Sequence, residues 1–159
     1  MEIVFNAEEL EKIETIKAKY PETKAALMPT LWMAQKKWGW LSPDVMRYVG
    51  DLLGLTYAHV EGVATFYTMY FKKPMGKFHL QVCTNVSCML RKGDELYQHV
   101  SEKLKIGHME RTEDGVFSLE EVECMGACGD SPMVAVNEDF YENMSIIKVD
   151  ELIFSLKNT

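Results

Sequence analysis

The chain holds four cysteines, and all of them lie in two short segments. Cys83 and Cys88 form a C-x4-C pair, and Cys124 and Cys128 form a C-x3-C pair after thirty-five intervening residues. Each pair stands beside Gly, Asn or Ser and follows a stretch with the alternating pattern of a β-strand. Any fold for this chain must therefore explain four thiols gathered in loops beyond the ends of two strands.

Three ordinary roles for cysteine fit this pattern poorly. Buried thiols that act as small hydrophobic groups are not expected in loops of this kind. Structural disulfides are rare in the cytosol, and a chain of 159 residues that is 47% hydrophobic can build a core without them. A thiol–disulfide catalyst usually has C-x-x-C, a spacing that neither pair shows. A bound metal remains.

Two metal centres stay open on spacing alone, and a [2Fe–2S] cluster is favoured over zinc. Structural zinc generally uses C-x2–4-C, so these pairs lie at the edge of that range. A [2Fe–2S] cluster takes two thiolates on each iron and, being wider than one ion, tolerates longer loops. Gly126, Gly129 and a predicted helix start at Cys88 would bring backbone N–H groups to an anionic cluster. No histidine accompanies the cysteines, so a mixed Cys/His ligand set is not expected; the four are His59, His79, His99 and His108.

The first half of the sequence predicts helices. Asn6 and Glu9 form a capping-box pattern before a helix that runs to about residue 20. A second helix is expected over about 24–38, with a kink or a late start at Pro29. Ser42-Pro43 starts a third helix that ends at Gly54, and Thr56 can cap a fourth, with Gly62 as a candidate break. Residues 1–75 are therefore predicted to form a helical bundle, used for docking.

The second half changes to a period of two. A half-buried strand is predicted at 78–82, a helix at 89–104, and strands at 109–112 and 116–122 joined by Asp114-Gly115. Strands at 133–136 and 140–141 and a helix at 150–156 complete the chain. Residues 76–159 are thus predicted to form a second domain, and the fold class is α+β.

The charges divide unevenly between the halves. Residues 1–75 carry nine Lys/Arg and nine Asp/Glu, whereas residues 76–159 carry eight and fifteen, so the whole net charge of −7 lies with the cysteines. A nucleic-acid surface would have the opposite sign. The acidic half indicates either a solvated face or docking to a basic protein surface.

No segment suggests a membrane span or a secretory leader. No apolar run approaches the about 18 to 20 residues that a spanning helix needs, and the N-terminus lacks a basic, apolar signal. The sequence therefore predicts a cytoplasmic protein without direct membrane insertion.

The cysteine segments resemble one family. Residues 83–90 (CTNVSCML) and 123–134 (ECMGACGDSPMV) are similar to the cluster loops of the thioredoxin-like [2Fe–2S] subunit, or 24 kDa subunit, of NADH:quinone oxidoreductase, respiratory complex I. The likeness extends over nearly the whole chain, including residues 29–39, 63–67 and 114–117. Ser87 departs from the proline that many members have before the second cysteine.

The resemblance implies a thioredoxin-like [2Fe–2S] ferredoxin domain after the helical bundle, with a cis peptide bond before Pro132. It implies that Cys83, Cys88, Cys124 and Cys128 hold one [2Fe–2S] cluster. The chain would exchange single electrons with the FMN of an NADH-oxidising flavoprotein subunit, so FMN and NADH belong to that partner. Other peripheral-arm subunits of complex I, on the cytoplasmic side of the inner membrane, would be further partners, and no catalytic residue is expected on this chain.

Three alternatives remain at this stage. Related subunits serve as the diaphorase part of NAD-linked hydrogenases or formate dehydrogenases. A free-standing thioredoxin-like ferredoxin is a second alternative, although a small carrier needs no helical docking bundle. A zinc-stabilised interaction module is the third.

Overall fold

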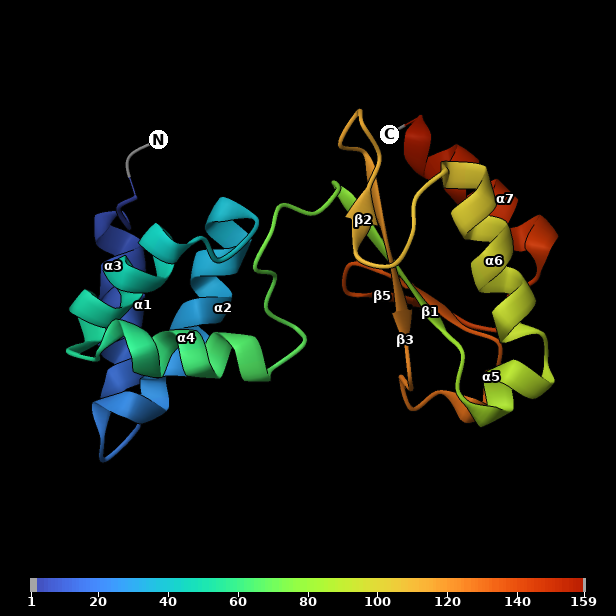
Figure 1. Ribbon diagram of the computed structural model, residues 1–159. Helices are drawn as coiled ribbons and strands as arrows, with labels where there is room; N and C mark the ends of the chain where they lie inside the picture. The colour runs from blue at the N-terminus through green and yellow to red at the C-terminus, as the bar shows by residue number, and fades with distance from the viewer. Residues whose placement is uncertain (1–2, 159) are drawn as a thin grey trace. The chain divides into compact units, whose positions relative to one another are not determined.

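The protein consists of two compact units, residues 1–74 and residues 75–159 (Figure 1). The computed structural model describes residues 3–158. The first unit is helical, and the second combines a sheet with helices. The α+β class is therefore confirmed.

Local capping signals set the helices of the first unit. Helix α1 (Ala7–Lys17) begins after Asn6, whose side chain accepts a hydrogen bond from the Glu9 N–H at 2.9 Å, while Glu9 accepts one from the Asn6 N–H at 2.7 Å. This is the predicted capping box. The helix ends at Lys17, earlier than the sequence suggested, and the chain turns before Pro21.

The later helices begin and end close to the predicted signals. A short 3₁₀ turn, η1 (Thr23–Ala26), precedes α2 (Leu27–Trp38), so Pro29 lies in the first turn, where its missing N–H costs nothing. This is the late start proposed from the sequence. Helix α3 (Pro43–Leu53) is capped by Ser42, and α4 (Tyr57–Phe66) is capped by Thr56. Helix α4 runs through Gly62, so the candidate break there was wrong.

The core of the first unit takes its members from all four helices at helical spacing. Buried side chains include Ile13, Leu27, Leu31, Val45, Val49 and Val60. Tyr70, which follows α4, is also buried and donates its O–H to the Met28 carbonyl at 2.9 Å. Buried Gln35 bonds the same segment, donating to the Met69 carbonyl at 2.8 Å and accepting from the Phe71 N–H at 2.6 Å. The residues after α4 therefore complete this core.

The second unit contains a five-stranded sheet in the order β2-β3-β1-β4-β5. Strands β1 and β3 run parallel, and every other neighbouring pair is antiparallel. The bounds are β1 (Phe78–Cys83), β2 (Glu110–Arg111), β3 (Phe117–Val122), β4 (Val134–Val136) and β5 (Asp139–Tyr141). The β2–β3 hairpin turns at Gly115, whose φ of 71° suits glycine, as the Asp114-Gly115 pair predicted.

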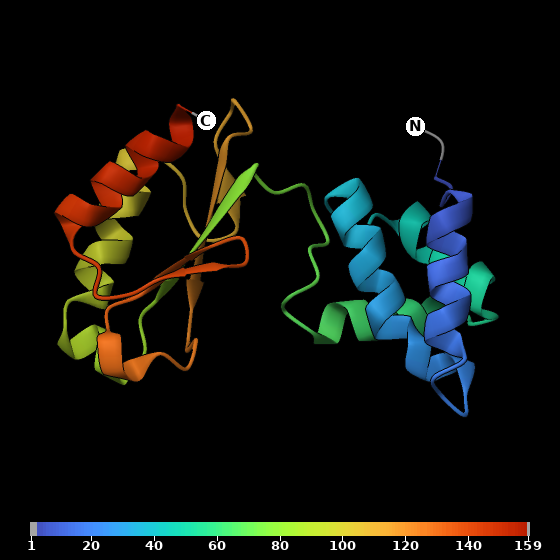
Figure 2. The ribbon, with the colours of Figure 1, turned by 180° about the vertical axis from the view of Figure 1, so that it is seen from behind.

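Two long helices cover one face of this sheet. Helices α6 (Gly93–Leu104) and α7 (Ile146–Lys157) lie side by side against it in both views (Figures 1 and 2). Leu80 and Val82 of β1 pack there with Leu96 of α6 and Val149 of α7 in one buried cluster. No helix within residues 3–158 has the length and apolar character needed to cross a membrane.

The helices and the central strand of the second unit differ from the sequence-based expectation in three ways. The helix predicted at 89–104 is two helices, α5 (Val86–Leu90) and α6, separated at Lys92, which has a positive φ of 74°. Helix α7 starts four residues earlier than expected because Ser145 caps it. Strand β1 is central and not half-buried, since His79 on the face away from α6 and α7 is buried as well.

Candidate metal centre

The two cysteine segments meet because their strands are parallel neighbours. Cys83 is the last residue of β1 and pairs with Val122, the last residue of β3. Parallel strands end at the same edge of a sheet. The segment that carries Cys124, two residues beyond β3, therefore starts at the same edge as Cys83.

Cys88 comes back to this edge on the short helix α5. The Asn85 side chain accepts a hydrogen bond from the Val86 N–H at 2.6 Å and starts the helix. The chain then passes so close that a Cβ on Gly93 would lie 2.7 Å from the Cys83 carbonyl oxygen and 2.9 Å from the Cys88 backbone. Only glycine fits this approach, which presses α5 onto the end of β1.

The four thiols differ in burial. Cys83 and Cys88 are each 3% exposed, whereas Cys124 and Cys128 are exposed. The sequence placed all four in loops, but Cys83 belongs to a strand and Cys88 to a helix. That expectation was wrong for the first pair, because β1 and α5 extend further than the alternating pattern showed.

Contacts cross between the two segments. The Cys83 thiol donates to the Glu123 carbonyl, with 3.7 Å between sulfur and oxygen. Met133 packs with Cys83 and Cys88 in a small buried cluster that Met125 and Ala127 border. The floor of the site is therefore apolar and joins both loops.

One backbone N–H points at a cysteine sulfur. Gly126 donates to the Cys124 sulfur at 3.4 Å, and its φ is 81°. Residues that carry a side chain rarely adopt that backbone conformation, so glycine is needed for this bond. Such bonds stabilise negative charge on sulfur, as the sequence suggested for Gly126.

The thiols influence one another electrostatically. Burial raises the pKa of the Cys88 thiol to about 11, with further increases from hydrogen bonding with Cys83 and from the charges of Cys83 and Cys128, while a backbone bond from Met133 opposes them. The charge of Cys128 thus acts on the Cys88 thiol. Thiolates that lie close together repel one another unless cations lie between them, and a bound metal centre supplies those cations.

The four cysteines form one buried pair and one exposed pair of possible ligands. Among residues 3–158, no three Cys, His, Asp or Glu side chains are grouped so that they could hold one metal ion. A [2Fe–2S] cluster requires two thiolates on each of two irons. The buried pair and the exposed pair, with an apolar floor and a sulfur-directed N–H, fit that requirement.

His79 belongs to a polar network within the sheet. On the face of the sheet away from α6 and α7, the His79 ring bonds Ser118 at 2.8 Å and Glu120 at 2.9 Å, and Gln81 donates to the same Glu120 oxygen at 2.8 Å. Sequence reasoning missed this network. Its signal lies in the register, which pairs His79 with Ser118 and Gln81 with Glu120.

Comparison with known proteins decides the family. The sequence profile of the thioredoxin-like [2Fe–2S] ferredoxin family matches residues 13–157. The chain belongs to this family. Membership confirms both the resemblance noted in the sequence and a [2Fe–2S] cluster, instead of zinc, as the cofactor.

Relatives of this thioredoxin-like [2Fe–2S] protein match over nearly their full length. The E-type subunit of the NADH-quinone oxidoreductase of Rickettsia prowazekii is 41% identical over 152 residues, which cover 94% of this chain and 86% of that one. The E2-type subunit of the Rhizobium meliloti enzyme is 42% identical over 147 residues, covering 92% and 88%.

A solved structure shares the fold of this thioredoxin-like [2Fe–2S] protein. A chain of an NAD+-reducing [NiFe]-hydrogenase in the air-oxidized state superposes with a TM-score of 0.74 at 18% identity, over 83% of this chain and 23% of that chain. This chain therefore spans about a quarter of the hydrogenase chain.

The peptide bond between Ser131 and Pro132 is cis, as the resemblance implied.

Proposed function

We propose that this chain is the electron-transfer subunit of an NADH:quinone oxidoreductase and that Cys83, Cys88, Cys124 and Cys128 hold its [2Fe–2S] cluster. The observation that carries the assignment is the delivery of both cysteine segments to one sheet edge by the parallel strands β1 and β3. Relatives that match over more than four fifths of their length are named as E-type subunits of that complex, which supports the context.

The chain's own residues prepare the site for a change in charge. A bound [2Fe–2S] cluster supplies a centre that accepts and releases one electron at a time. The Gly126 N–H donates a hydrogen bond to the Cys124 sulfur and thereby stabilises added negative charge there. Met133 and the buried pair of thiols keep water from the inner side, while the exposed Cys124 and Cys128 form the outer side.

The partner in this proposal is a flavoprotein subunit that binds NADH and FMN. NADH releases two electrons as a hydride, so a flavin must divide them before a one-electron centre can take one. The acidic surface of residues 76–159 would meet basic residues of the partner. The helical first unit provides a separate docking body, and other peripheral-arm subunits would complete a complex on the cytoplasmic side of the membrane.

Metal content and spectra of the purified chain test the cofactor assignment. We expect about two irons and two sulfides per chain and one reducible EPR signal after dithionite, as a [2Fe–2S] centre requires. Single Cys→Ser variants at the four positions should lose or shift that signal, whereas Ser87→Ala should keep it. Stoichiometric zinc in a colourless protein, or an unchanged signal in Cys124→Ser, would refute the ligand set.

The hydrogenase alternative differs in the partner and not in the site. The fold shared with the NAD+-reducing [NiFe]-hydrogenase chain keeps a diaphorase role as the second candidate. Affinity purification of the full chain from its native cells separates the two. Co-purification of an FMN-containing subunit with quinone reductase activity supports the first proposal, and recovery of nickel with hydrogen-dependent NAD+ reduction supports the second.

A further inference from the structure

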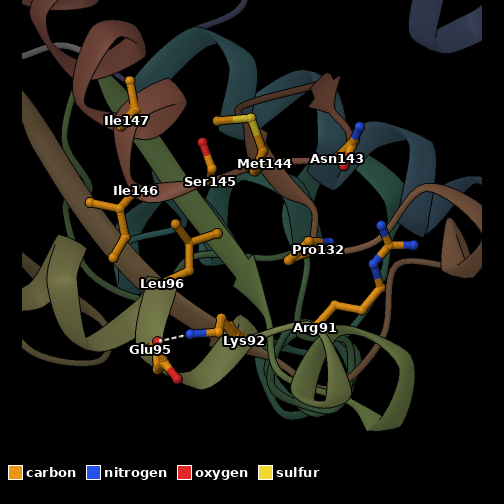
Figure 3. Close-up of a pocket in the computed structure, with 10 residues that line it drawn as sticks. All are labelled: Arg91, Lys92, Glu95, Leu96, Pro132, Asn143, Met144, Ser145, Ile146 and Ile147. Atoms are coloured by element: carbon orange, nitrogen blue, oxygen red, sulfur yellow. Dashed lines mark hydrogen bonds and ion pairs between the residues drawn. The ribbon is translucent and has the colours of Figure 1, made fainter.

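A pocket of about 410 Å³ opens beside the cysteine loops, where α6 and α7 begin (Figure 3). Buried Leu96, Pro132 and Met144 form its apolar floor. Exposed Ile146 and Ile147 stand on one side of it, and Arg91 stands on the other in this view. None of these six residues is one of the cysteines.

The wall of the pocket is bonded to the cysteine loops. The Met144 N–H donates to the Pro132 carbonyl at 2.8 Å, and the Asn143 N–H donates to the carbonyl of Asp130, in the turn that begins at Cys128, at 2.5 Å. The Ser131 hydroxyl donates to the Ser87 carbonyl in α5 at 3.3 Å. Anything seated in the pocket therefore lies directly against the frame of the cysteine site.

Large apolar side chains are exposed at the pocket. Ile146 and Ile147 line it and are 43% and 72% exposed. In the sequence, Leu90 immediately precedes Arg91 and is 76% exposed. Exposed apolar side chains beside a hollow mark a contact surface for another molecule.

The rim carries an unbalanced basic side chain within an acidic unit. Arg91 and Lys92 line the pocket and are two of the eight Lys and Arg residues in 76–159, where fifteen are acidic. Lys92 pairs with Glu95, which also lines the pocket, at 3.1 Å. Arg91 forms no ion pair with another side chain of the described residues 3–158. Its guanidinium is therefore available for a carboxylate from outside.

We propose that this pocket receives a segment of a partner subunit in which an apolar side chain stands beside an Asp or Glu. The apolar side chain fills the hollow over Leu96 and Met144, and the carboxylate pairs with Arg91 in a forked geometry that guanidinium favours. The inference rests on the proposed function only in taking the partner from the same complex. It adds a basic contact to a unit whose remaining surface is acidic.

A second copy of this chain fits the pocket poorly. A twofold contact places the same patch on both sides, so two Arg91 rims would face each other. Like charges brought together oppose association. The charge of the rim therefore indicates a partner of different sequence.

Cross-linking in the intact complex identifies the occupant. A photoreactive benzoylphenylalanine replaces Ile147 in the full chain, and the complex is irradiated, digested and sequenced by mass spectrometry. We expect a segment of another subunit with Asp or Glu within three residues of the linked apolar position. A link to a second copy of this chain or to phospholipid, or no link at all, overturns the proposal.

Charge reversal tests the role of Arg91. Arg91→Glu should weaken binding of the full chain to the complex lacking it by about tenfold or more, while Arg91→Lys retains part of the affinity. Arg111→Glu, the same change at exposed Arg111 of β2, is the matched control and should stay within about twofold. Circular dichroism confirms folding, and Ile147→Asp provides a second variant. Equal affinity for Arg91→Glu and the control refutes the proposal.

EPR spectra of the same samples distinguish a failure of this inference from a failure of the proposed function. The EPR signal of the cluster should persist in Arg91→Glu, because the contact of Arg91 with the cysteine segments runs through its backbone N–H, which donates to the Cys88 carbonyl at 3.0 Å and is kept in the variant. Absence of a cluster from the unsubstituted chain would refute the assigned function, whereas the cross-link would still report the occupant of the pocket.

Discussion

Replacing Gly93 by alanine tests the close approach that holds Cys83 and Cys88 together. A Cβ at this position would lie 2.7 Å from the Cys83 carbonyl oxygen and 2.9 Å from the carbonyl carbon and oxygen of Cys88. All three atoms belong to the backbone and cannot rotate away. The end of β1 and helix α5 must therefore move apart to accommodate one methyl group.

The magnitude follows from two opposing effects. Overpacking of a buried site costs about 1–3 kcal/mol, and the upper end applies here because only backbone is available to move. Alanine also restricts the unfolded chain and thereby returns about 0.4–1 kcal/mol. The net loss of unfolding free energy in Gly93→Ala is thus about 2 kcal/mol, or roughly a thirtyfold change in the folding equilibrium.

Urea unfolding can report on the two units separately. All three tryptophans, Trp32, Trp38 and Trp40, lie in residues 1–74, so tryptophan fluorescence follows the first unit alone. Far-UV circular dichroism follows both units. With a slope of about 1–2 kcal/mol per molar urea, the transition of the second unit should move down by about 1–2 M while the fluorescence transition stays in place.

Gly107 provides the matched control. A Cβ on Gly107 would come no closer than 3.4 Å to the carboxylate of Glu110, which is a flexible side chain. Gly107→Ala should therefore leave the transition of the second unit nearly unchanged. Iron content should fall in Gly93→Ala and not in Gly107→Ala. A Gly93→Ala protein with the wild-type transition and full iron content would refute the reasoning.

Three further changes test other parts of the fold. Burial disfavours the Glu120 carboxylate, but hydrogen bonds from His79 and Gln81 outweigh it and hold the pKa of this group below its usual value. Its stabilisation is complete above the unfolded pKa of about 4.3 and is lost as the pH falls through the lower folded pKa. Glu120→Gln should therefore lower the urea midpoint near neutral pH and flatten its decline in acid; a parallel decline would contradict this. Gln35→Leu removes two hydrogen bonds to the backbone after α4 and should destabilise the first unit by about 2 kcal/mol by tryptophan fluorescence, with an unchanged midpoint as the contrary result. Gly62→Ala fills open space within α4 and should stabilise the same unit by about 1 kcal/mol, whereas a lower midpoint would imply an unseen contact.

The first unit was largely predictable because its boundaries depend on neighbouring residues. Asn6, Ser42 and Thr56 cap helices through bonds to the third residue that follows each cap. Gly39 and Gly54 end helices in the left-handed conformation that glycine allows. These signals act within one turn and are visible in the sequence. The helical continuity at Gly62 was missed because packing outweighs the weak propensity of one glycine.

The second unit was less predictable because distant residues decide its details. Helix α5 is separated from α6 at Lys92, directly before the residue Gly93 that contacts the end of β1, ten residues earlier in the chain. The parallel pairing of β1 with β3 has no local signature, and neither has the burial of polar His79 in the middle of the sheet.

The sequence predicted the type of metal centre but not the burial of the cysteines that would hold it. Spacing and neighbouring glycines indicated an iron–sulfur centre over other uses of thiols, and the family match confirmed the cluster. The division into a buried and an exposed pair could not be foreseen, because it depends on how far β1 and α5 extend. The basic pocket also escaped notice, since Arg91 and Ile147 are more than fifty residues apart in the sequence.

The parallel arrangement of β1 and β3 also has a consequence for biosynthesis. Cys83 and Cys88 are synthesised before β3, and the chain must cross over through α6 before β3 can pair with β1 and bring the second cysteine segment to the same edge. Met133, which packs with both early thiols, and Asn143 and Met144, whose N–H groups bond the later loop, are made later still. A nascent chain therefore offers at most two of the four thiols in native surroundings. We therefore expect the cluster to be assembled on a released or nearly finished polypeptide, in which Cys124 and Cys128 are the exposed pair.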